Sequence, residues 1–572
     1  MVEVAKLLEP VSKLRQRRAG PLVLELDLTE GISDESPGDP LGQLLAMRRQ
    51  RLFDILEGIR RGARDPRVKA LIAKIGSAPI SFGKLQELRT AVGVFRASGK
   101  PALAWSESFG DFGPGTASYY LATAFSEIAL VPSGAVGLTG LSVTNRFLRD
   151  AVEKLGVDYE IGARHEYKNA VNMLTERDFT GPHREATERI VASLTEQVVE
   201  GISEGRGLSA QDVRSLIDRG PFISHEALEA GLVDRLGYRD EIYGELLGRF
   251  RGPESEHEGA RLQFVSRYQR AQTLASRVPA VQRGEYVALV SGIGQIIPGR
   301  SRRSPLGGSS AMGSDTVAAA FRAARADPKA RAVVFRVDSG GGSYTASDVI
   351  RREVKLTSEA GKPVVVSMGD VAASGGYFIA LGADSIVAKP GTLTGSIGVF
   401  IVKAVLSELM GKLGISSDSI DAGSHATMYS TDRKFSESEW ERVNAMLDHV
   451  YDDFTAKVAE ARGMTREQVH EVARGRVWTG ADAHTHGLVD ELGGVETAAG
   501  IARKRAGLPS MTALRPFPQP NPLERLVPPE SSEDKTAARL RVSSWGPLAE
   551  LSARIGLPAA GPLVMPGTWE IR

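Results

Sequence analysis

The sequence has no cysteine among its 572 residues. This absence excludes a disulfide framework, a cysteine nucleophile and metal sites built from thiolates. The sequence also lacks an uninterrupted apolar run of about 18 residues, which a transmembrane helix would need, and residues 1–20 lack the apolar centre of a secretory signal. We therefore expect a cytoplasmic protein without a transmembrane helix. The pattern of residues 1–19 allows a basic amphipathic helix, and with it a peripheral contact at the inner face of the cell membrane.

An excess of charge of one sign is missing as well. Lysine and arginine number 71 and aspartate and glutamate 70, so no general positive field would hold a polyanion, and we expect no nucleic acid partner. The nine histidines lie in no setting that suggests a catalytic triad, although the sequence does not exclude one. His484 and His486 are close together but lack a further ligand nearby. We expect neither a metal nor a cofactor.

The chain repeats itself. Four collinear pairs of segments match: 58–75 with 320–337, 97–105 with 359–367, 119–134 with 377–392, and 203–237 with 459–493. Four matches in the same order indicate a duplication. Each copy alternates short Val/Ile/Leu/Ala runs with amphipathic helical segments, which predicts an α/β fold of two tandem repeats with mostly parallel sheets flanked by helices. We predict an N-terminal segment at 1–19, repeats at 20–250 and 286–508, a linker at 251–285 and a C-terminal extension at 509–572.

Ser374 lies at the most distinctive corner of the sequence. A buried strand is expected before it, in the run 364–383, and Gly375 and Gly376 follow it at the start of a helix. This corner would expose a hydroxyl beside the unpaired N–H groups of a helix N-terminus, which can stabilise an oxyanion. Ala372 replaces the first glycine of a G-x-S-x-G elbow, so the corner is not that of an α/β-hydrolase. We predict that Ser374 is a nucleophile, and the alternative is a helix cap.

A second glycine corner, Gly340-Gly341-Gly342, stands between an expected strand and a helix. The G-x-G-x-x-G pattern is absent, which disfavours a dinucleotide loop. We interpret the corner as the other wall of an oxyanion hole, because glycine lets backbone N–H groups approach a scissile carbonyl. A tight turn with only a structural role is the alternative.

Four runs of the sequence together carry a resemblance: 165–180, 338–350, 370–380 and 391–400. They resemble the long, two-repeat form of signal peptide peptidase A, whose fold is similar to those of crotonases and Clp proteases. The resemblance covers roughly residues 20–505. It implies Ser374 as the nucleophile, Lys168 in Tyr167-Lys168-Asn169-Ala170 as the general base, and Ser396 as a residue that holds the lysine. It also implies an oxyanion hole formed by backbone donors at Gly375, Gly341 and Gly342.

The repeat alignment separates the two halves of this dyad. The offset of 258 that relates 119–134 to 377–392 places Thr116 opposite Ser374 and Ala426 opposite Lys168. Each copy therefore keeps one half, and we expect the halves to meet across a domain or subunit boundary. The lysine must be neutral to act as a base, which requires burial, so we expect Glu166 to point away from it. The chain also departs from the N-S-P-G-G run common in the family, with Asp338 and Gly340 where that run has asparagine and proline.

We therefore expect a serine endopeptidase that cuts hydrophobic or unfolded peptides, such as signal-peptide remnants, through an acyl-enzyme. The resemblance implies a homo-oligomer, which we expect to be a tetramer. The alternative is a non-catalytic peptide-binding or scaffolding assembly on the same fold. Acyl-CoA chemistry on a crotonase fold is a third hypothesis, which is disfavoured because that chemistry needs no serine–lysine pair.

Overall fold

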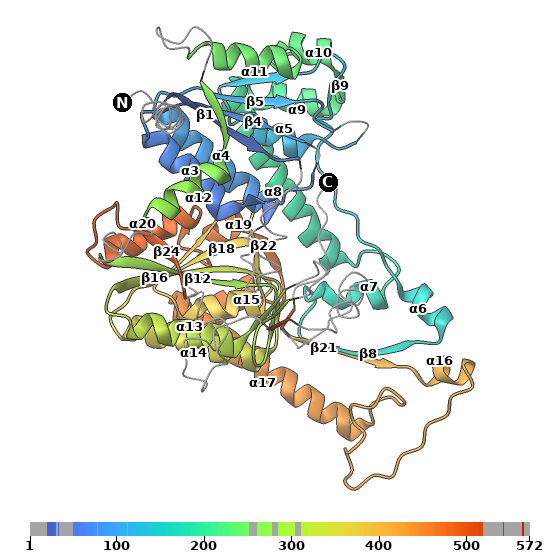
Figure 1. Ribbon diagram of the computed structural model, residues 1–572. Helices are drawn as coiled ribbons and strands as arrows, with labels where there is room; N and C mark the ends of the chain where they lie inside the picture. Colours follow the sequence, from blue (N-terminus) through green and yellow to red (C-terminus); the bar gives the residue numbers. More distant parts are fainter. Residues whose placement is uncertain are drawn as a thin grey trace, which may run out of the picture. The chain divides into compact units, whose positions relative to one another are not determined.

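The computed structural model describes residues 20–29, 32–33, 50–76, 78–110, 113–250, 260–276, 284–303 and 310–518, and two strands at 541–542 and 563–564. The predicted helix at 1–19 lies outside these residues. The chain forms two compact units (Figure 1). Unit 1 comprises Met1–Ser142 and Thr195–Arg283, and unit 2 comprises Val143–Leu194 and Gly284–Ile571. Within the described residues, no helix combines the length and the apolar character that crossing a bilayer requires.

Unit 1 is built on a six-stranded sheet in the order β10-β6-β5-β4-β1-β11, in which every pair is parallel. Its strands are β1 (Leu22–Asp27), β4 (Val68–Lys74), β5 (Ala102–Ser106), β6 (Glu127–Leu130), β10 (Arg235–Leu236) and β11 (Arg261–Phe264). Two short strand pairs lie outside this sheet: β2 (Ile32–Ser33) pairs with β3 (Gln50–Arg51), and β7 (Ala135–Val136) pairs with β9 (Phe222–Ile223). Its helices are α3 (Leu52–Arg64), α4 (Phe82–Ala97), α5 (Thr116–Ala122), α9 (Ala210–Arg219), α10 (Ser224–Glu229), α11 (Arg239–Gly248) and α12 (Val265–Ser276). The central strands are apolar and buried along nearly their whole length, as in a parallel sheet covered on both faces.

Unit 2 has a larger sheet in the order β22-β20-β18-β16-β12-β24, with β19 beside β18 and β23 beside β19. The strands are β12 (Tyr286–Ile293), β16 (Ala330–Ser339), β18 (Val364–Ala373), β19 (Ser385–Ala388), β20 (Leu393–Gly395), β22 (Val477–Thr479), β23 (Glu491–Leu492) and β24 (Leu514–Pro516). The helices are α13 (Ser314–Ala326), α14 (Tyr344–Glu359), α15 (Gly375–Phe378), η2 (Ile379–Gly382), α17 (Glu437–Arg462), α18 (Arg466–Val472), α19 (Gly480–Thr485) and α20 (Val495–Arg505). All pairs are parallel except β20 with β22. The predicted α/β class with mostly parallel sheets is confirmed.

The remaining elements of unit 2 form a second small sheet and a projecting arm. A six-stranded sheet runs in the order β25-β14-β15-β13-β17-β26 and consists of β13 (Gln295–Ile297), β14 (Arg302–Arg303), β15 (Ala311–Gly313), β17 (Gly341–Gly342), β25 (Arg541–Val542) and β26 (Leu563–Val564). The arm contains α6 (Arg149–Leu155), β8 (Asp158–Ala163), η1 (Asn169–Val171), α7 (Asn172–Thr175), β21 (Phe400–Val405) and α16 (Ser407–Lys412), and β8 pairs antiparallel with β21 (Figure 1). Helix α8 (Gly181–Arg206) begins in unit 2 and ends in unit 1.

The duplication is visible in buried hydrogen bonds. In unit 1 the Tyr119 hydroxyl donates to the Leu232 carbonyl at 2.7 Å, and in unit 2 the Tyr377 hydroxyl donates to the Leu488 carbonyl at 2.8 Å. The offset that relates these tyrosines is the one found in the sequence, 258 residues. The two units therefore share internal contacts as well as a sequence pattern.

The compact units do not follow the repeat boundaries drawn from the sequence. Residues 143–194 belong to the first repeat in sequence but to unit 2 in space, where β8 pairs with β21. The segment 251–285, expected as a linker, contains β11 and α12. Three strands of the expected extension, β24, β25 and β26, pair with β12, β14 and β17.

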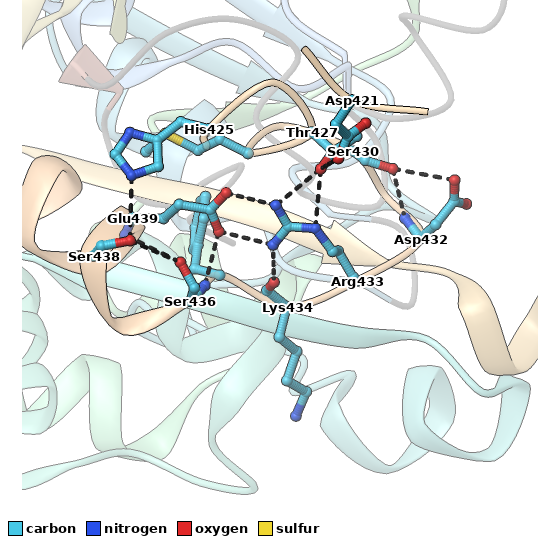
Figure 2. Close-up of polar contacts among 12 residues, drawn as sticks. Asp421, His425, Thr427, Ser430, Asp432, Arg433, Lys434, Ser436, Ser438 and Glu439 are labelled. Carbon is cyan, nitrogen blue, oxygen red and sulfur yellow. Dashed lines mark hydrogen bonds and ion pairs between the residues drawn. The ribbon is translucent and has the colours of Figure 1, made fainter. Parts of the chain in front are cut away.

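The start of α17 is fixed by a polar network (Figure 2). Ser436 and Glu439 form the capping box that the sequence indicates, each side chain accepting from the other's backbone N–H. The guanidinium of Arg433 donates two hydrogen bonds, of 2.6 and 2.8 Å, to the buried carboxylate of Glu439. The network orients α17, whose apolar stripe, with Phe454 among its members, is buried in the core of unit 2.

Candidate active site

Ser374 stands between the end of β18 and the start of α15, as predicted. Its φ angle is +54°, an unfavourable conformation for a residue with a Cβ. The expectation that this corner exposes the hydroxyl is wrong, because the side chain of Ser374 is fully buried. Two backbone bonds hold the conformation: the Ser374 N–H donates to the Gly395 carbonyl at 2.8 Å, and its carbonyl accepts from the Phe378 N–H at 2.9 Å. Strain of this kind concentrates at functional sites, where the surrounding structure enforces it.

Lys168 and Ser396 meet Ser374 inside unit 2. The Lys168 Nζ lies 3.0 Å from the Ser374 Oγ, 2.9 Å from the Ser396 Oγ and 3.0 Å from the Ser396 carbonyl oxygen. Ser396 lies between β20 and β21 with a φ of +51° and is also fully buried. The three side chains singled out from the sequence therefore converge within one compact unit of one chain. The halves of the dyad were expected to meet across a domain or subunit boundary, and the structure brings them together inside one unit of one chain.

Two glycines that the sequence reasoning missed let the Lys168 backbone approach this site. A Cβ on Gly475 would lie 2.6 to 2.7 Å from the backbone N, Cα and Cβ of Lys168, and Gly475 has a φ of +87°. A Cβ on Gly398 would lie 3.3 Å from the Lys168 Cδ and 2.8 Å from the Gly475 Cα. The Tyr167 N–H donates to the Arg474 carbonyl at 3.2 Å, which joins the lysine loop to the same turn. Gly398 lies within the T-G-S-I-G motif, which was a signal for it, whereas nothing local in the sequence marked Gly475.

The environment of Lys168 favours a neutral amine. The side chain is 2% exposed, and burial lowers its pKa from 10.5 to about 7 because the ammonium form loses hydration. The neighbouring carboxylate of Glu166 is engaged elsewhere, in an ion pair of 2.9 Å with Arg474 at the surface. The ring of Phe400 lies 6.0 Å from the Nζ and lines the apolar side of the site. A half-deprotonated amine at neutral pH is what a general base for a serine hydroxyl requires.

The glycine corner lies against the start of α15. A Cβ on Gly375 would lie 3.1 Å from the Gly341 Cα and 3.1 Å from the Gly342 N, so these backbones are in close contact. The Gly341 N–H donates to the Ser339 Oγ at 3.1 Å and is therefore already bonded. The carboxylate of Asp338 accepts a hydrogen bond of 3.1 Å from the Val371 N–H. This hydrogen bond joins β16 to β18.

The corresponding corner of unit 1 has a different chemistry. Thr116, aligned with Ser374, is the first residue of α5, and its Oγ1 accepts a hydrogen bond of 3.2 Å from the Thr139 N–H. The hydroxyl is buried and supports the backbone of its own unit. Among the residues that the structure describes, no three histidine or carboxylate side chains gather in a way that would hold a metal ion.

Comparison with known proteins gives consistent matches. A family model described as peptidase family S49 matches residues 94–247 and 357–509, once in each repeat. A chloroplastic serine protease SPPA of Arabidopsis thaliana is 32% identical over 460 residues, covering 80% of this chain and 66% of the relative. Protease 4 of Salmonella typhi is 33% identical (81% of this chain, 73% of the relative), and Protease 4 of Haemophilus influenzae is 29% identical (82% and 75%). The alignment with the solved structure of a ClpP1 mutant of Listeria monocytogenes covers 36% of this chain and 91% of the ClpP1 chain, at 17% identity and a TM-score of 0.24.

Proposed function

This chain belongs to peptidase family S49, and from that premise we propose that it cleaves peptide bonds with Ser374 as the nucleophile and Lys168 as the general base. The observation that carries the proposal is the 3.0 Å approach of the Lys168 Nζ to the Ser374 Oγ in a fully buried site. A lysine with a pKa of about 7 is neutral in about half of the molecules at pH 7. An unburied lysine would be neutral in fewer than about one in a thousand.

The contacts of Lys168 suit a neutral amine with two N–H groups and one lone pair. The Ser396 carbonyl oxygen can only accept, so one N–H points to it, and the second N–H points to the Ser396 Oγ. The lone pair then faces the hydroxyl of Ser374. We assign Ser396 the role of positioning the amine, because it occupies both N–H groups and leaves the lone pair for the nucleophile.

The reaction follows from this arrangement. Lys168 accepts the hydroxyl proton as the Ser374 Oγ attacks the carbonyl carbon, and then donates it to the departing amine. The negative oxygen of the tetrahedral intermediate would be stabilised by backbone N–H groups. Gly375 is the donor on which the proposal rests most, because the first N–H groups of a helix have no acceptor within it. Gly342 is a second candidate, whereas Gly341 would have to exchange its bond to Ser339.

Water then attacks the acyl-enzyme. Lys168, which has returned to the neutral form with the loss of the amine product, accepts a proton from that water. Lys168 then returns this proton to the Ser374 Oγ as the bond from that oxygen to the acyl carbon breaks, so the carboxylic acid product leaves and the Ser374 hydroxyl is restored. By the resemblance, we propose hydrophobic or unfolded peptides, such as signal-peptide remnants, as substrates, and a homo-oligomer, a tetramer, as the working assembly.

The test compares single substitutions in the full chain. Ser374→Ala and Lys168→Ala are expected to lower kcat/KM on a fluorogenic hydrophobic peptide by at least about 1,000-fold, as removal of a dyad member would. Labelling of Ser374 by an active-site-directed phosphonate should fall in parallel. Ser385→Ala removes another buried serine, at the start of β19, and should leave activity unchanged.

Three outcomes would contradict parts of the proposal. Activity that survives in Lys168→Ala would remove the lysine from the mechanism. A folded wild-type protein that binds peptides without turnover would favour the scaffold alternative. Light scattering after size exclusion would check the assembly, and a monomer with full activity would contradict the tetramer.

A further inference from the structure

The turn between α18 and β22 is bonded to both segments that hold the amine of Lys168. The Ser396 N–H donates to the Arg476 carbonyl at 2.7 Å, and the Tyr167 N–H donates to the Arg474 carbonyl at 3.2 Å. Tyr167 directly precedes Lys168 in the chain. The turn therefore fixes the lysine loop against the segment that carries Ser396.

The side chain of Tyr167 adds a second connection to this turn. Its hydroxyl donates a hydrogen bond of 2.5 Å to the carboxylate of Glu185, on α8. The same carboxylate accepts two hydrogen bonds, of 2.6 and 3.2 Å, from the guanidinium of Arg476. The guanidinium carbon of Arg476 also lies 5.0 Å from the centre of the Tyr167 ring and 4.2 Å from that of Trp478, in β22. The tyrosine is thus held both through its hydroxyl and through its ring.

These contacts form a closed path around the amine of Lys168. The Lys168 Nζ lies 2.9 Å from the Ser396 Oγ, and the Ser396 N–H leads to the backbone of Arg476. From Arg476 the path returns through Glu185 and Tyr167 to the backbone of the lysine. A lysine side chain is flexible along its four-carbon stem, so a fixed position of the Nζ requires that the backbone is fixed as well.

We propose that Tyr167, Glu185 and Arg476 act together as a clamp that positions Lys168 for proton transfer. This inference rests on the proposed peptidase function, to which it adds three positioning residues. The clamp lies partly at the surface, since the side chain of Glu185 is 51% exposed, and exposed ion pairs contribute little to stability. A displacement of a catalytic group by about 1 Å, by contrast, can lower a rate about 100-fold. Loss of the clamp should therefore reduce turnover far more than stability.

The test removes one polar group at a time from the full chain. Tyr167→Phe deletes the hydroxyl and keeps the ring, and Glu185→Gln deletes the charge at nearly constant size. Each is expected to lower kcat on a fluorogenic peptide about tenfold and to leave KM within about twofold, because the clamp acts on proton transfer and not on substrate binding. The double variant should also lose only about tenfold, because the effects of two residues in one clamp do not multiply.

Tyr286→Phe is the matched control. The Tyr286 hydroxyl donates a hydrogen bond of 2.7 Å to the carboxylate of Asp327, and the guanidinium carbon of Arg515 lies 4.9 Å from the centre of its ring. The same types of group therefore surround it. Tyr286 is the first residue of β12, however, whereas Ser374 follows the last residue of β18, and β12, β16 and β18 run parallel. This variant should keep the kcat of the wild type, with a loss of stability in urea titrations similar to that of Tyr167→Phe.

Three results would overturn the inference. The first is a kcat of Tyr167→Phe and Glu185→Gln equal to that of Tyr286→Phe. The second is a higher KM at unchanged kcat, which would indicate a contact with the substrate. The third is a double variant in which the two losses multiply. Tyr167→Phe and Glu185→Gln alter different elements, so either one that folds is sufficient for the comparison of kcat. Failure of the peptidase proposal has a different signature, which is turnover that is absent from the wild type or does not depend on Ser374.

Discussion

The pKa of Lys168 should respond to a single charge placed at Phe400. Phe400 is 2% exposed, and its ring lies 6.0 Å from the Lys168 Nζ. A carboxylate at that distance would favour the ammonium by about 2.8 kcal/mol at an effective dielectric constant of about 20, or about 2 pKa units. The variant Phe400→Glu should therefore raise the pKa of Lys168 from about 7 to about 9.

The expected effect on catalysis follows from the fraction of neutral amine. At pH 7 that fraction would fall from about one half to about one hundredth, so kcat/KM should drop by about 50-fold. Because the lysine must be deprotonated to act, the loss should be recovered as the pH rises through 9. The assay is kcat/KM for a fluorogenic peptide between pH 5.5 and about 10.5, since this parameter reports the ionisation of the free enzyme.

Phe400→Gln is the matched control. Glutamine has nearly the size of glutamate and no charge, so any loss through altered packing should appear in both variants. In Phe400→Gln the acidic limb of the profile should stay near pH 7, with activity reduced by a constant factor. Two results for a folded Phe400→Glu protein would refute the reasoning about Lys168. The first is an acidic limb that stays near pH 7. The second is an activity that stays below that of Phe400→Gln at every pH up to about 10.5.

Three further predictions concern the same site. Ser396→Ala should lower kcat/KM by about 10- to 100-fold, because the Lys168 amine loses one of the partners that orient it, and a pH profile should show the limb still near 7. Gly475→Ala should lower kcat/KM by about 100-fold, because the added methyl group would push Lys168 away from Ser374. Gly463→Ala is the control: Gly463 has a φ of +62° but no atom within 4 Å of an added Cβ, so enzyme kinetics should stay unchanged and denaturation should show a loss of stability only. The free energy of unfolding of the wild type should rise relative to that of Lys168→Met by about 3 kcal/mol between pH 7 and 9.5 in urea titrations. The sign follows because the pKa of this lysine is lower in the folded state, so the unfolded state binds more protons in that range.

The corner at Ser374 could be predicted from local sequence, whereas the site around it could not. A strand followed by a serine and two glycines at a helix start has a local geometry that its own residues dictate. Lys168, by contrast, lies in a loop, where a lysine is ordinarily solvated. Its burial depends on Gly475 and Ser396, more than 200 residues away in the chain, so only the resemblance and the repeat alignment pointed to it.

The division of the chain into units was also beyond local patterns. The segment expected as a linker contains a four-residue strand, β11, which pairs with β1 some 240 residues earlier. Strand β26 has two residues and is flanked by prolines, so it carries no alternating pattern that sequence reading could detect. Pairings of this kind are decided by tertiary contacts, which outweigh the weak preferences of short segments.

The placement of residues 143–194 explains how a duplicated chain arrives at a single site. By pairing β8 with β21, the first repeat brings Lys168 to Ser374 of the second repeat within one compact unit. In the corner of unit 1 the aligned hydroxyl, on Thr116, accepts a hydrogen bond from the backbone of its own unit. The same strand pairing therefore brings one residue from each repeat into a single contact. The contact between the Lys168 Nζ and the Ser374 Oγ is made within one chain and needs no partner subunit.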